Sequence, residues 1–103
     1  MSTMTSFDFG LKRADLLQPA ALIDGAWVQA DDGASLDVTD PATGRVIARV
    51  PRIGRAETER AIAGAAAALP AWRARTARER AQVLRRWAEL MLAHQDDLGR
   101  LMT

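Results

Sequence analysis

The chain has 103 residues, with 14 Lys and Arg against 13 Asp and Glu and a formal net charge of +1. This length allows one small domain or part of one, and the near balance of charge gives no global field that would attract nucleic acid or an anionic membrane. The absence of cysteine excludes disulfides, thiolate metal sites and a nucleophilic thiol.

The N-terminal stretch, residues 1–20, has no sustained hydrophobic period, and we predict an irregular segment there. Its apolar side chains allow either one short helix or contacts with a neighbouring surface. The stretch lacks the apolar core of a secretory signal, and the longest apolar run falls far short of the roughly 20 residues that span a bilayer. We therefore expect a cytoplasmic protein with no membrane partner.

Two hairpins follow. Asp24-Gly25 is a type I′ turn signal within "LIDGAWV", which predicts strands across residues 22–28. The stretch "DVTDPATGRVIARVP" predicts strands near residues 35–40 and 45–50, joined by a turn in which Pro41 fixes φ and Gly44 takes a positive φ. Because Pro51 has no amide donor, it closes the second of these strands.

The period then changes to 3.6, and we predict helices near residues 55–69 and 77–94 and from about 96 to the terminus. Pro70 is expected to end the first helix. In the second, "TARE" is a capping box formed by Thr76 and Glu79. The apolar stripe continues to the last residues without a C-cap glycine, so we expect the chain to stop within an element.

Three features are weighed as candidate sites. Arginines crowd residues 73–86, which indicates a solvated face or internal ion pairs, with a helix that binds nucleic acid as the alternative. His94 is the sole histidine and is interpreted as a hydrogen-bonded structural residue. Asp96 and Asp97 are adjacent, so they lie on different helix faces and are interpreted as first-turn charges rather than a catalytic dyad.

The aromatic and sulfur-containing side chains of the helical half are expected to be core: Trp72, Trp87, Met91 and Met102. The glycines form neither a G-x-G-x-x-G motif nor a P-loop. The residues therefore predict an architecture without an activity. A small helical interaction protein and an Arg-rich binding module for nucleic acid or protein remain the alternatives to an enzyme fragment.

A family resemblance covers the chain from about residue 16 to its end. The stretches "LIDGAWV", "DVTDPATGRVIARVP" and "LPAWRARTARERAQVLRRWAELMLAHQDDLGRLMT" closely resemble the N-terminal segment of the aldehyde dehydrogenase superfamily. Within it, "TARERAQVLRRW" and "HQDDLGRLMT" are most similar to the bacterial NAD(P)-dependent succinate-semialdehyde dehydrogenase branch.

The resemblance implies an α/β fold that is partial. Residues 21–103 would be N-terminal hairpins and helices of a Rossmann-like NAD(P)-binding domain, incomplete at the C-terminus. The full-length oxidoreductase would oxidise succinate semialdehyde to succinate with NAD or NADP and would form a homo-oligomer. In that family a cysteine thiolate attacks the aldehyde, and hydride passes to the nicotinamide. None of those residues is in this chain, so we expect it to be inactive and to bind no cofactor alone, with the remainder of the enzyme as its partner.

The resemblance also implies a cation-binding site at one place in this chain. Some family members bind a monovalent cation through backbone carbonyls just before the Asn/Asp-Pro turn, which corresponds here to Val38 and Thr39. The remaining ligands would lie outside this chain. A strand end rich in carbonyls is also expected of any hairpin, so both interpretations stay open.

Overall fold

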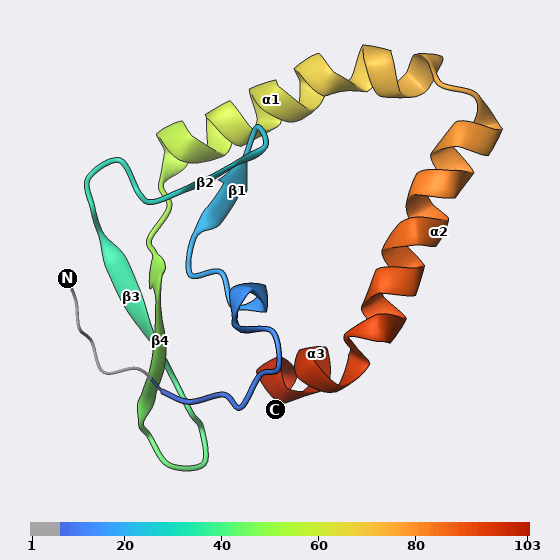
Figure 1. Cartoon of the computed structure of the whole chain (residues 1–103). Helices are drawn as coiled ribbons and strands as arrows, with labels where there is room; N and C mark the ends of the chain where they lie inside the picture. Colours follow the sequence, from blue (N-terminus) through green and yellow to red (C-terminus); the bar gives the residue numbers. More distant parts are fainter. Residues whose placement is uncertain (1–6) are drawn as a thin grey trace. The chain divides into compact units, whose positions relative to one another are not determined.

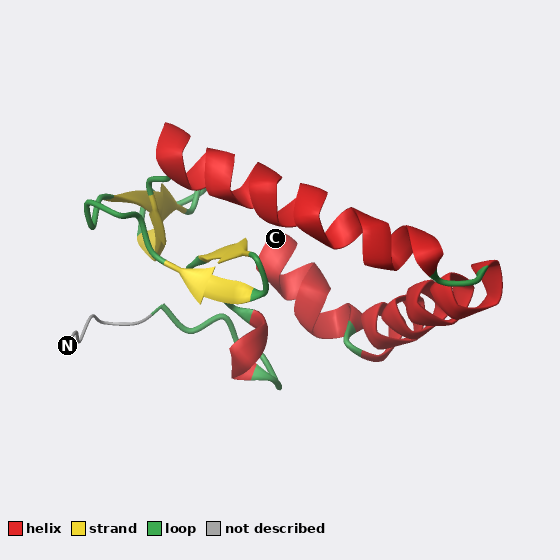
Figure 2. Ribbon diagram, turned by 90° about the horizontal axis from the view of Figure 1, so that it is seen from above, coloured by secondary structure: helices red, strands yellow, loops and turns green. Residues whose placement is uncertain are grey.

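The computed structural model describes residues 7–103, and the predictions for residues 1–6 lie outside the described part. Within the described part, two two-stranded sheets are followed by three α-helices (Figures 1 and 2). The described part divides into two compact units, the first formed by residues 7–8 and 18–64 and the second by residues 9–17 and 65–103. All four strands belong to the first unit. The mixture of short strands and helices confirms the predicted α/β class.

The first hairpin is the predicted type I′ arrangement. Strand β1 (Ala21–Ile23) pairs antiparallel with β2 (Ala26–Val28), which places Leu22 opposite Trp27. The two turn residues, 24 and 25, have φ values of 51° and 78°. A type I′ turn requires a positive φ at both positions, which Asp-Gly tolerates better than most pairs. The turn residues therefore set the register of this hairpin.

The second hairpin joins β3 (Ser35–Thr39) and β4 (Val46–Pro51) in an antiparallel pair. The Asp40 carboxylate accepts the backbone N–H of Ala42 at 2.8 Å, and the Asp40 carbonyl accepts the N–H of Gly44 at 2.7 Å. Gly44 has a φ of 77°, in the left-handed region that favours glycine. These contacts confirm the predicted turn.

The first helix is longer than the sequence predicted. Helix α1 (Arg55–Ala74) continues through Pro70, so the expectation that it ends near Pro70 is wrong. A proline inside a helix removes one N–H donor, here the bond to the carbonyl of Ala66, and disfavours the preceding turn. The alanine-rich surroundings have high helix propensity, and the helix continues for four more residues past the missing bond.

The second unit contains the predicted helical half. A short 3-10 helix, η1 (Ala14–Leu16), lies in its N-terminal segment, and α2 (Ala77–Ala93) begins at the predicted capping box. A break at His94 separates α2 from α3 (Gln95–Met102). None of these helices, nor α1, is both long and apolar enough to cross a bilayer.

Few side chains of the described part are buried, and the predicted core of the helical half is exposed. Ala30 is the buried hydrophobic residue among those described. Trp87 is 60% exposed and Met102 is 83% exposed, and Met91 is also exposed, so the prediction that these three are core residues is wrong here. Trp72 is half-buried. The physical reason is that no other described element covers Trp87 and Met91 on α2 or Met102 at the end of α3 (Gln95–Met102).

Candidate functional site

The predicted cation-site residues, Val38 and Thr39, lie at the end of β3. Val38 pairs with Ala48 and Thr39 with Val46, so the ladder is irregular between these two positions. A bulge of this kind leaves a residue out of the regular hydrogen-bonding pattern. Across residues 7–103, no group of three or more His, Asp or Glu side chains is arranged to hold a metal ion. A cation at this strand end would therefore depend on backbone carbonyls.

His94 occupies the junction between α2 and α3 and is half-buried. Its backbone N–H donates to the carbonyl of Leu90 at 3.1 Å, and its own carbonyl accepts the N–H of Leu98 at 2.9 Å. The imidazole makes no capping hydrogen bond to α3. The structural role of His94 is thus carried by its backbone, and the described residues bring no cluster of ligands to its ring.

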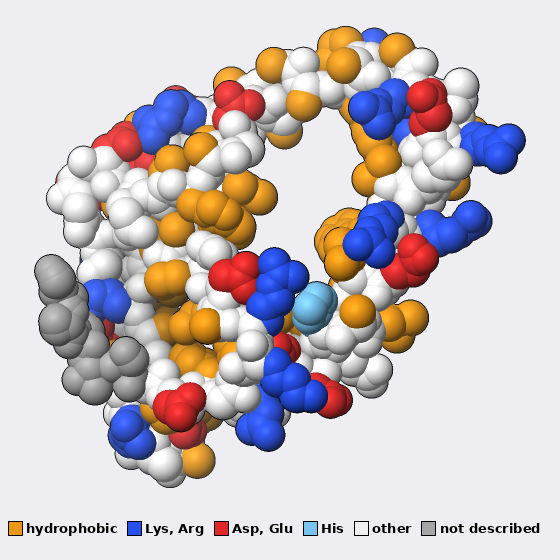
Figure 3. Space-filling view, viewed as in Figure 1, with side chains coloured by type: hydrophobic (Ala, Val, Ile, Leu, Met, Phe, Trp, Pro, Cys, Tyr) orange, Lys and Arg blue, Asp and Glu red, His pale blue; other side chains and the backbone are white. Residues whose placement is uncertain are grey.

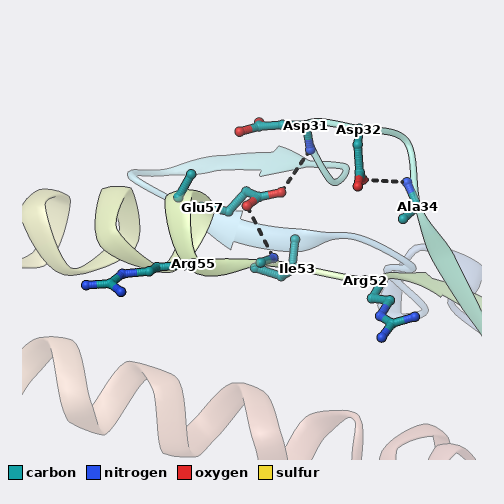
Figure 4. A pocket seen from close by; sticks show the side chains of 9 residues that line it. Asp31, Asp32, Ala34, Arg52, Ile53, Arg55 and Glu57 are labelled. Carbon is teal, nitrogen blue, oxygen red and sulfur yellow. Dashed lines mark hydrogen bonds between the residues drawn. The ribbon is translucent and has the colours of Figure 1, made fainter.

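A cavity of about 360 Å³ lies at the N-terminus of α1, lined by Asp31, Asp32, Ala34 and residues 52–57 (Figure 4). Glu57 points into it and is only 5% exposed. One carboxylate oxygen of Glu57 accepts the backbone N–H of Asp31 at 2.9 Å, and the other accepts the N–H of Gly54 at 3.2 Å. Glu57 therefore connects the loop after β2 to the start of α1.

The position of Glu57 decides what this cavity can bind. A free helix N-terminus attracts anions because its first N–H groups have no partner within the helix. Here the carboxylate of Glu57 takes the Gly54 N–H and places a negative charge at the same end. A phosphate group would meet this charge, so this cavity does not fit the pyrophosphate of a dinucleotide. The cavity is a structural joint.

A second contact supports the same joint from its outer side. Arg60 donates to both carboxylate oxygens of Asp31, at 2.9 and 2.8 Å. These hydrogen bonds from Arg60 are the main reason that the pKa of the Asp31 carboxyl lies below its usual range. Both side chains are about half exposed, and such surface pairs stabilise proteins little. The buried carboxylate of Glu57 is therefore the stronger element of the joint.

The second unit has an equivalent anchor at the start of α3. Asp97 is 4% exposed and accepts the backbone N–H groups of Lys12 and Arg13, at 3.0 and 2.9 Å. The hydrogen bond from Lys12 is the largest cause of a pKa for Asp97 below the usual carboxyl value, and the Arg13 bond adds to it against the opposing effect of burial. Asp97 thus holds the N-terminal segment of this unit against α3.

Sequence reasoning placed Asp97 in a first helical turn but missed the long-range hydrogen bonds of Glu57 and Asp97. For Glu57 a signal was present, because a Glu three residues after Gly54 is the reciprocal half of a capping box. Its bond to Asp31, 26 residues away, had no local signal. Asp97 contacts residues 84 and 85 positions distant, which no spacing rule predicts.

The arginine-rich stretch is solvated over most of its length. Five of its six arginines are exposed, namely Arg73, Arg75, Arg78, Arg85 and Arg86. Among residues 7–103, the salt bridges of the structure involve other arginines, such as Arg49 with Asp37 and Arg55 with Glu59. The solvated-face interpretation therefore holds for these five arginines. Arg80, which is half-buried, differs from the rest.

Comparison with known proteins identifies the family. A model of the aldehyde dehydrogenase family matches residues 27–103, well over half of the chain. The chain belongs to the aldehyde dehydrogenase family. This confirms the resemblance carried by the hairpin and helix stretches of the sequence.

Curated relatives place this segment within much longer enzymes. Glutarate-semialdehyde dehydrogenase of Pseudomonas aeruginosa is 59% identical over 93 residues, which cover 90% of this chain and 19% of that protein. The NADP-dependent succinate-semialdehyde dehydrogenase of Escherichia coli is 53% identical over the same share of each chain. 3-Sulfolactaldehyde dehydrogenase of Pseudomonas putida is 52% identical, again over 90% of this chain and 19% of its own. The chain thus spans about a fifth of the length of these relatives.

Solved structures confirm the fold at high identity. An NADP-dependent enzyme of E. coli matches 90% of this chain and 19% of its own, with 53% identity and a TM-score of 0.89. Succinate-semialdehyde dehydrogenase from Burkholderia pseudomallei matches 85% of this chain and 18% of its own, with 50% identity and a TM-score of 0.84. The elements described above therefore recur as one part of larger aldehyde dehydrogenase structures.

Proposed function

We propose that this chain is the N-terminal part of an NAD(P)-dependent aldehyde dehydrogenase that oxidises succinate semialdehyde to succinate. The observation that supports this most is 53% identity over 93 residues to the E. coli enzyme named for that substrate and for NADP. The branch expected from "TARERAQVLRRW" and "HQDDLGRLMT" agrees with it.

Glutarate semialdehyde is the second candidate substrate, since a relative named for it is 59% identical over the same length. The aldehydes in the three relatives' names share one chemical feature, which is an anionic group on the same small molecule as the aldehyde. We therefore propose an acidic short-chain aldehyde as the substrate class, and within it succinate semialdehyde first.

In this proposal the chain supplies scaffold rather than chemistry. Thioester formation on an aldehyde needs a thiolate, and this chain contains no cysteine. The cofactor would accept hydride from the substrate, but the cavity at the start of α1 does not fit its pyrophosphate, because the Glu57 carboxylate already accepts the Gly54 N–H there. The nucleophile and the cofactor site would come from parts of the enzyme outside these 103 residues, and the enzyme would act as a homo-oligomer.

The proposal includes a monovalent cation at the end of β3. The carbonyls of Val38 and Thr39 would contribute two ligands, and the irregular pairing between these residues supports this. A ligand that binds the folded state raises thermal stability with its concentration. The complete enzyme should therefore melt at a higher temperature as one of Na⁺ or K⁺ is raised at constant ionic strength. Equal melting temperatures throughout the titration would contradict the site.

The substrate proposal is tested with the coding region that contains this chain and the sequence that follows codon 103. The purified product is mixed with succinate semialdehyde, glutarate semialdehyde or neutral butanal, each with NAD or NADP, and formation of the reduced cofactor is followed by absorbance. We expect kcat/KM to be highest for succinate semialdehyde and lowest for butanal. A preference for glutarate semialdehyde would favour the second candidate, and a preference for butanal would contradict the acidic substrate class.

A further inference from the structure

In helix α2 the apolar side chains are exposed, whereas one arginine is half-buried. Every residue from Ala77 to Ala93 is exposed except Arg80, which is half-buried. Arg80, Leu84, Trp87 and Met91 follow one another at spacings of four, three and four residues, so they share one face of the helix. The three apolar members of this face are exposed, and Figure 3 shows hydrophobic side chains along α2 interspersed with Lys and Arg. We call these four residues the Arg80 face.

One donor atom of the arginine on this face, Nε, lacks a hydrogen-bond acceptor. The Nε atom of Arg80 is buried, and no partner for it exists within the described part of the chain. A buried donor without an acceptor is costly, even though the Arg80 side chain as a whole is only half-buried. The other five arginines of the stretch have exposed side chains and meet water instead. The acceptor that suits a guanidinium on an apolar face is a carboxylate, which can accept two parallel hydrogen bonds.

The length of the relatives indicates what covers this face. In the E. coli NADP-dependent enzyme the same elements superpose with a TM-score of 0.89, but they make up 19% of that chain. About four fifths of an aldehyde dehydrogenase therefore lies outside the segment described here. Exposed side chains as large as Trp87 and Leu84 on one helix face are typical of a surface that another element covers.

We propose that the Arg80 face of α2 docks against the remainder of the aldehyde dehydrogenase chain, and that this remainder supplies a carboxylate to Arg80. This inference rests on the proposed function, because it takes its occupant from the same family. It assigns Arg80 a positioning role that its arginine neighbours do not have. A second copy of this chain is the competing occupant.

The test uses a chimeric enzyme in which this chain replaces the matching N-terminal fifth of E. coli succinate-semialdehyde dehydrogenase. Leu84→Cys and Arg85→Cys are compared, since these neighbours lie on the Arg80 face and on the opposite side of α2. Maleimide labelling at each position is quantified by mass spectrometry in the folded chimeric enzyme. We expect labelling at position 84 to be at least about tenfold slower than at position 85. Equal rates would overturn the docking surface, and slowing only in concentrated samples of the isolated chain would favour a second copy.

The carboxylate is tested by Arg80→Met, with Arg78→Met as the matched control on the opposite side of the same turn. Removing one member of a buried ion pair leaves an unpaired charge. Arg80→Met should therefore shorten the half-life of the folded chimeric enzyme on heating by about tenfold or more, whereas Arg78→Met should leave it unchanged. Arg80→Lys keeps the charge and should recover part of the loss. Equal half-lives for Arg80→Met and Arg78→Met would overturn the pairing, and no recovery in Arg80→Lys would exclude a carboxylate.

These outcomes are separate from those of the substrate assay. Heating half-life is read from the loss of native fluorescence, which does not require activity. Protected labelling with an Arg80-specific loss, together with no oxidation of acidic aldehydes by the product of the complete coding region, would support the docking surface and contradict the proposed substrate. The reverse combination would contradict the docking surface alone.

Discussion

The start of α1 and the middle of α2 satisfy their polar groups in opposite ways. At the start of α1, the buried carboxylate of Glu57 accepts two backbone N–H groups, both supplied by the same unit. In the middle of α2, the Nε of Arg80 is buried without an acceptor and Trp87 is 60% exposed. The first region is complete within the chain. The second region combines exposed apolar side chains with a buried donor, as one side of an interface does.

This difference shows that a segment of a large fold can form its local structure while lacking the tertiary contacts that bury its helix faces. Hairpin turns and helix caps depend on a few neighbouring residues, so they do not require the rest of an enzyme. An apolar helix face gains its stability from burial, which requires a partner surface. Substitutions in the two regions should therefore respond differently to the presence of that partner.

The largest expected effect is at Trp87. In the chimeric enzyme, Trp87→Ala should lower the free energy of unfolding by about 3–5 kcal/mol, because a large buried side chain is lost. In the isolated chain the same change should have an effect within about 0.5 kcal/mol, as at other exposed positions. Denaturant unfolding of both proteins, with Arg85→Ala as control, measures the two values. Equal effects in the two proteins would break the comparison.

A smaller effect is expected at Glu57, and it should not depend on the rest of the enzyme. Glu57→Gln replaces one acceptor oxygen by an N–H₂ donor that faces a backbone N–H, which should cost about 1–3 kcal/mol in the chimeric enzyme. Glu59→Gln, at an exposed pair with Arg55, should cost no more than about 0.5 kcal/mol. In the isolated chain, hydrogen exchange at the Asp31 amide should accelerate in Glu57→Gln. Unchanged exchange there would contradict a joint made within this unit.

The capping box of α2 should contribute less. Thr76→Ala removes the hydroxyl that accepts the Glu79 N–H at 3.1 Å and should cost about 1 kcal/mol. Thr76→Ser retains the hydroxyl and should restore most of this stability. Chemical unfolding followed by far-UV circular dichroism checks both variants. If Thr76→Ala and Thr76→Ser were equally stable, the cap would have no role in starting α2.

The pH dependence of stability that Asp97 contributes should be confined to acid pH. Its pKa is lowered in the folded state, chiefly by the hydrogen bond from the Lys12 N–H. A lowered pKa contributes stability above the unfolded value of about 4, and this is lost as the pH falls through the folded value. Thermal melts from neutral to acid pH should show a shallower decline below about pH 4 in Asp97→Asn than in wild type. Parallel declines would show that Asp97 is not held as a carboxylate.

Much of the fold could be predicted from local patterns. Asp24-Gly25, the turn from Asp40 to Gly44 and the capping box at Thr76 each specify their element through contacts a few residues apart. Pro70 misled the prediction because its cost falls on one hydrogen bond, and an alanine-rich helix tolerates this loss. The resemblance to aldehyde dehydrogenases added the partial α/β domain architecture, which hydrophobic periodicity alone does not predict.

The functional features could be predicted only in part. The position of Asp97 in a first helical turn followed from the sequence, but the long-range partners of Glu57 and Asp97 lie 26 to 85 residues away and are set by the tertiary fold. The spacing of Trp87 on the helix predicted burial, and this was wrong because burial also needs a covering surface, which the described residues do not supply. Arg80 looked like one arginine among six until the structure showed that its Nε is buried.

The central claim, that this chain is scaffold for an aldehyde dehydrogenase whose chemistry lies elsewhere, is tested most directly by one assay. The isolated chain and the chimeric enzyme are each mixed with succinate semialdehyde and NAD or NADP, and absorbance of the reduced cofactor is recorded. The account predicts an aldehyde-dependent signal from the chimeric enzyme and none above a no-protein control from the isolated chain, which has no cysteine. Aldehyde-dependent reduction of the cofactor by the isolated chain would contradict it.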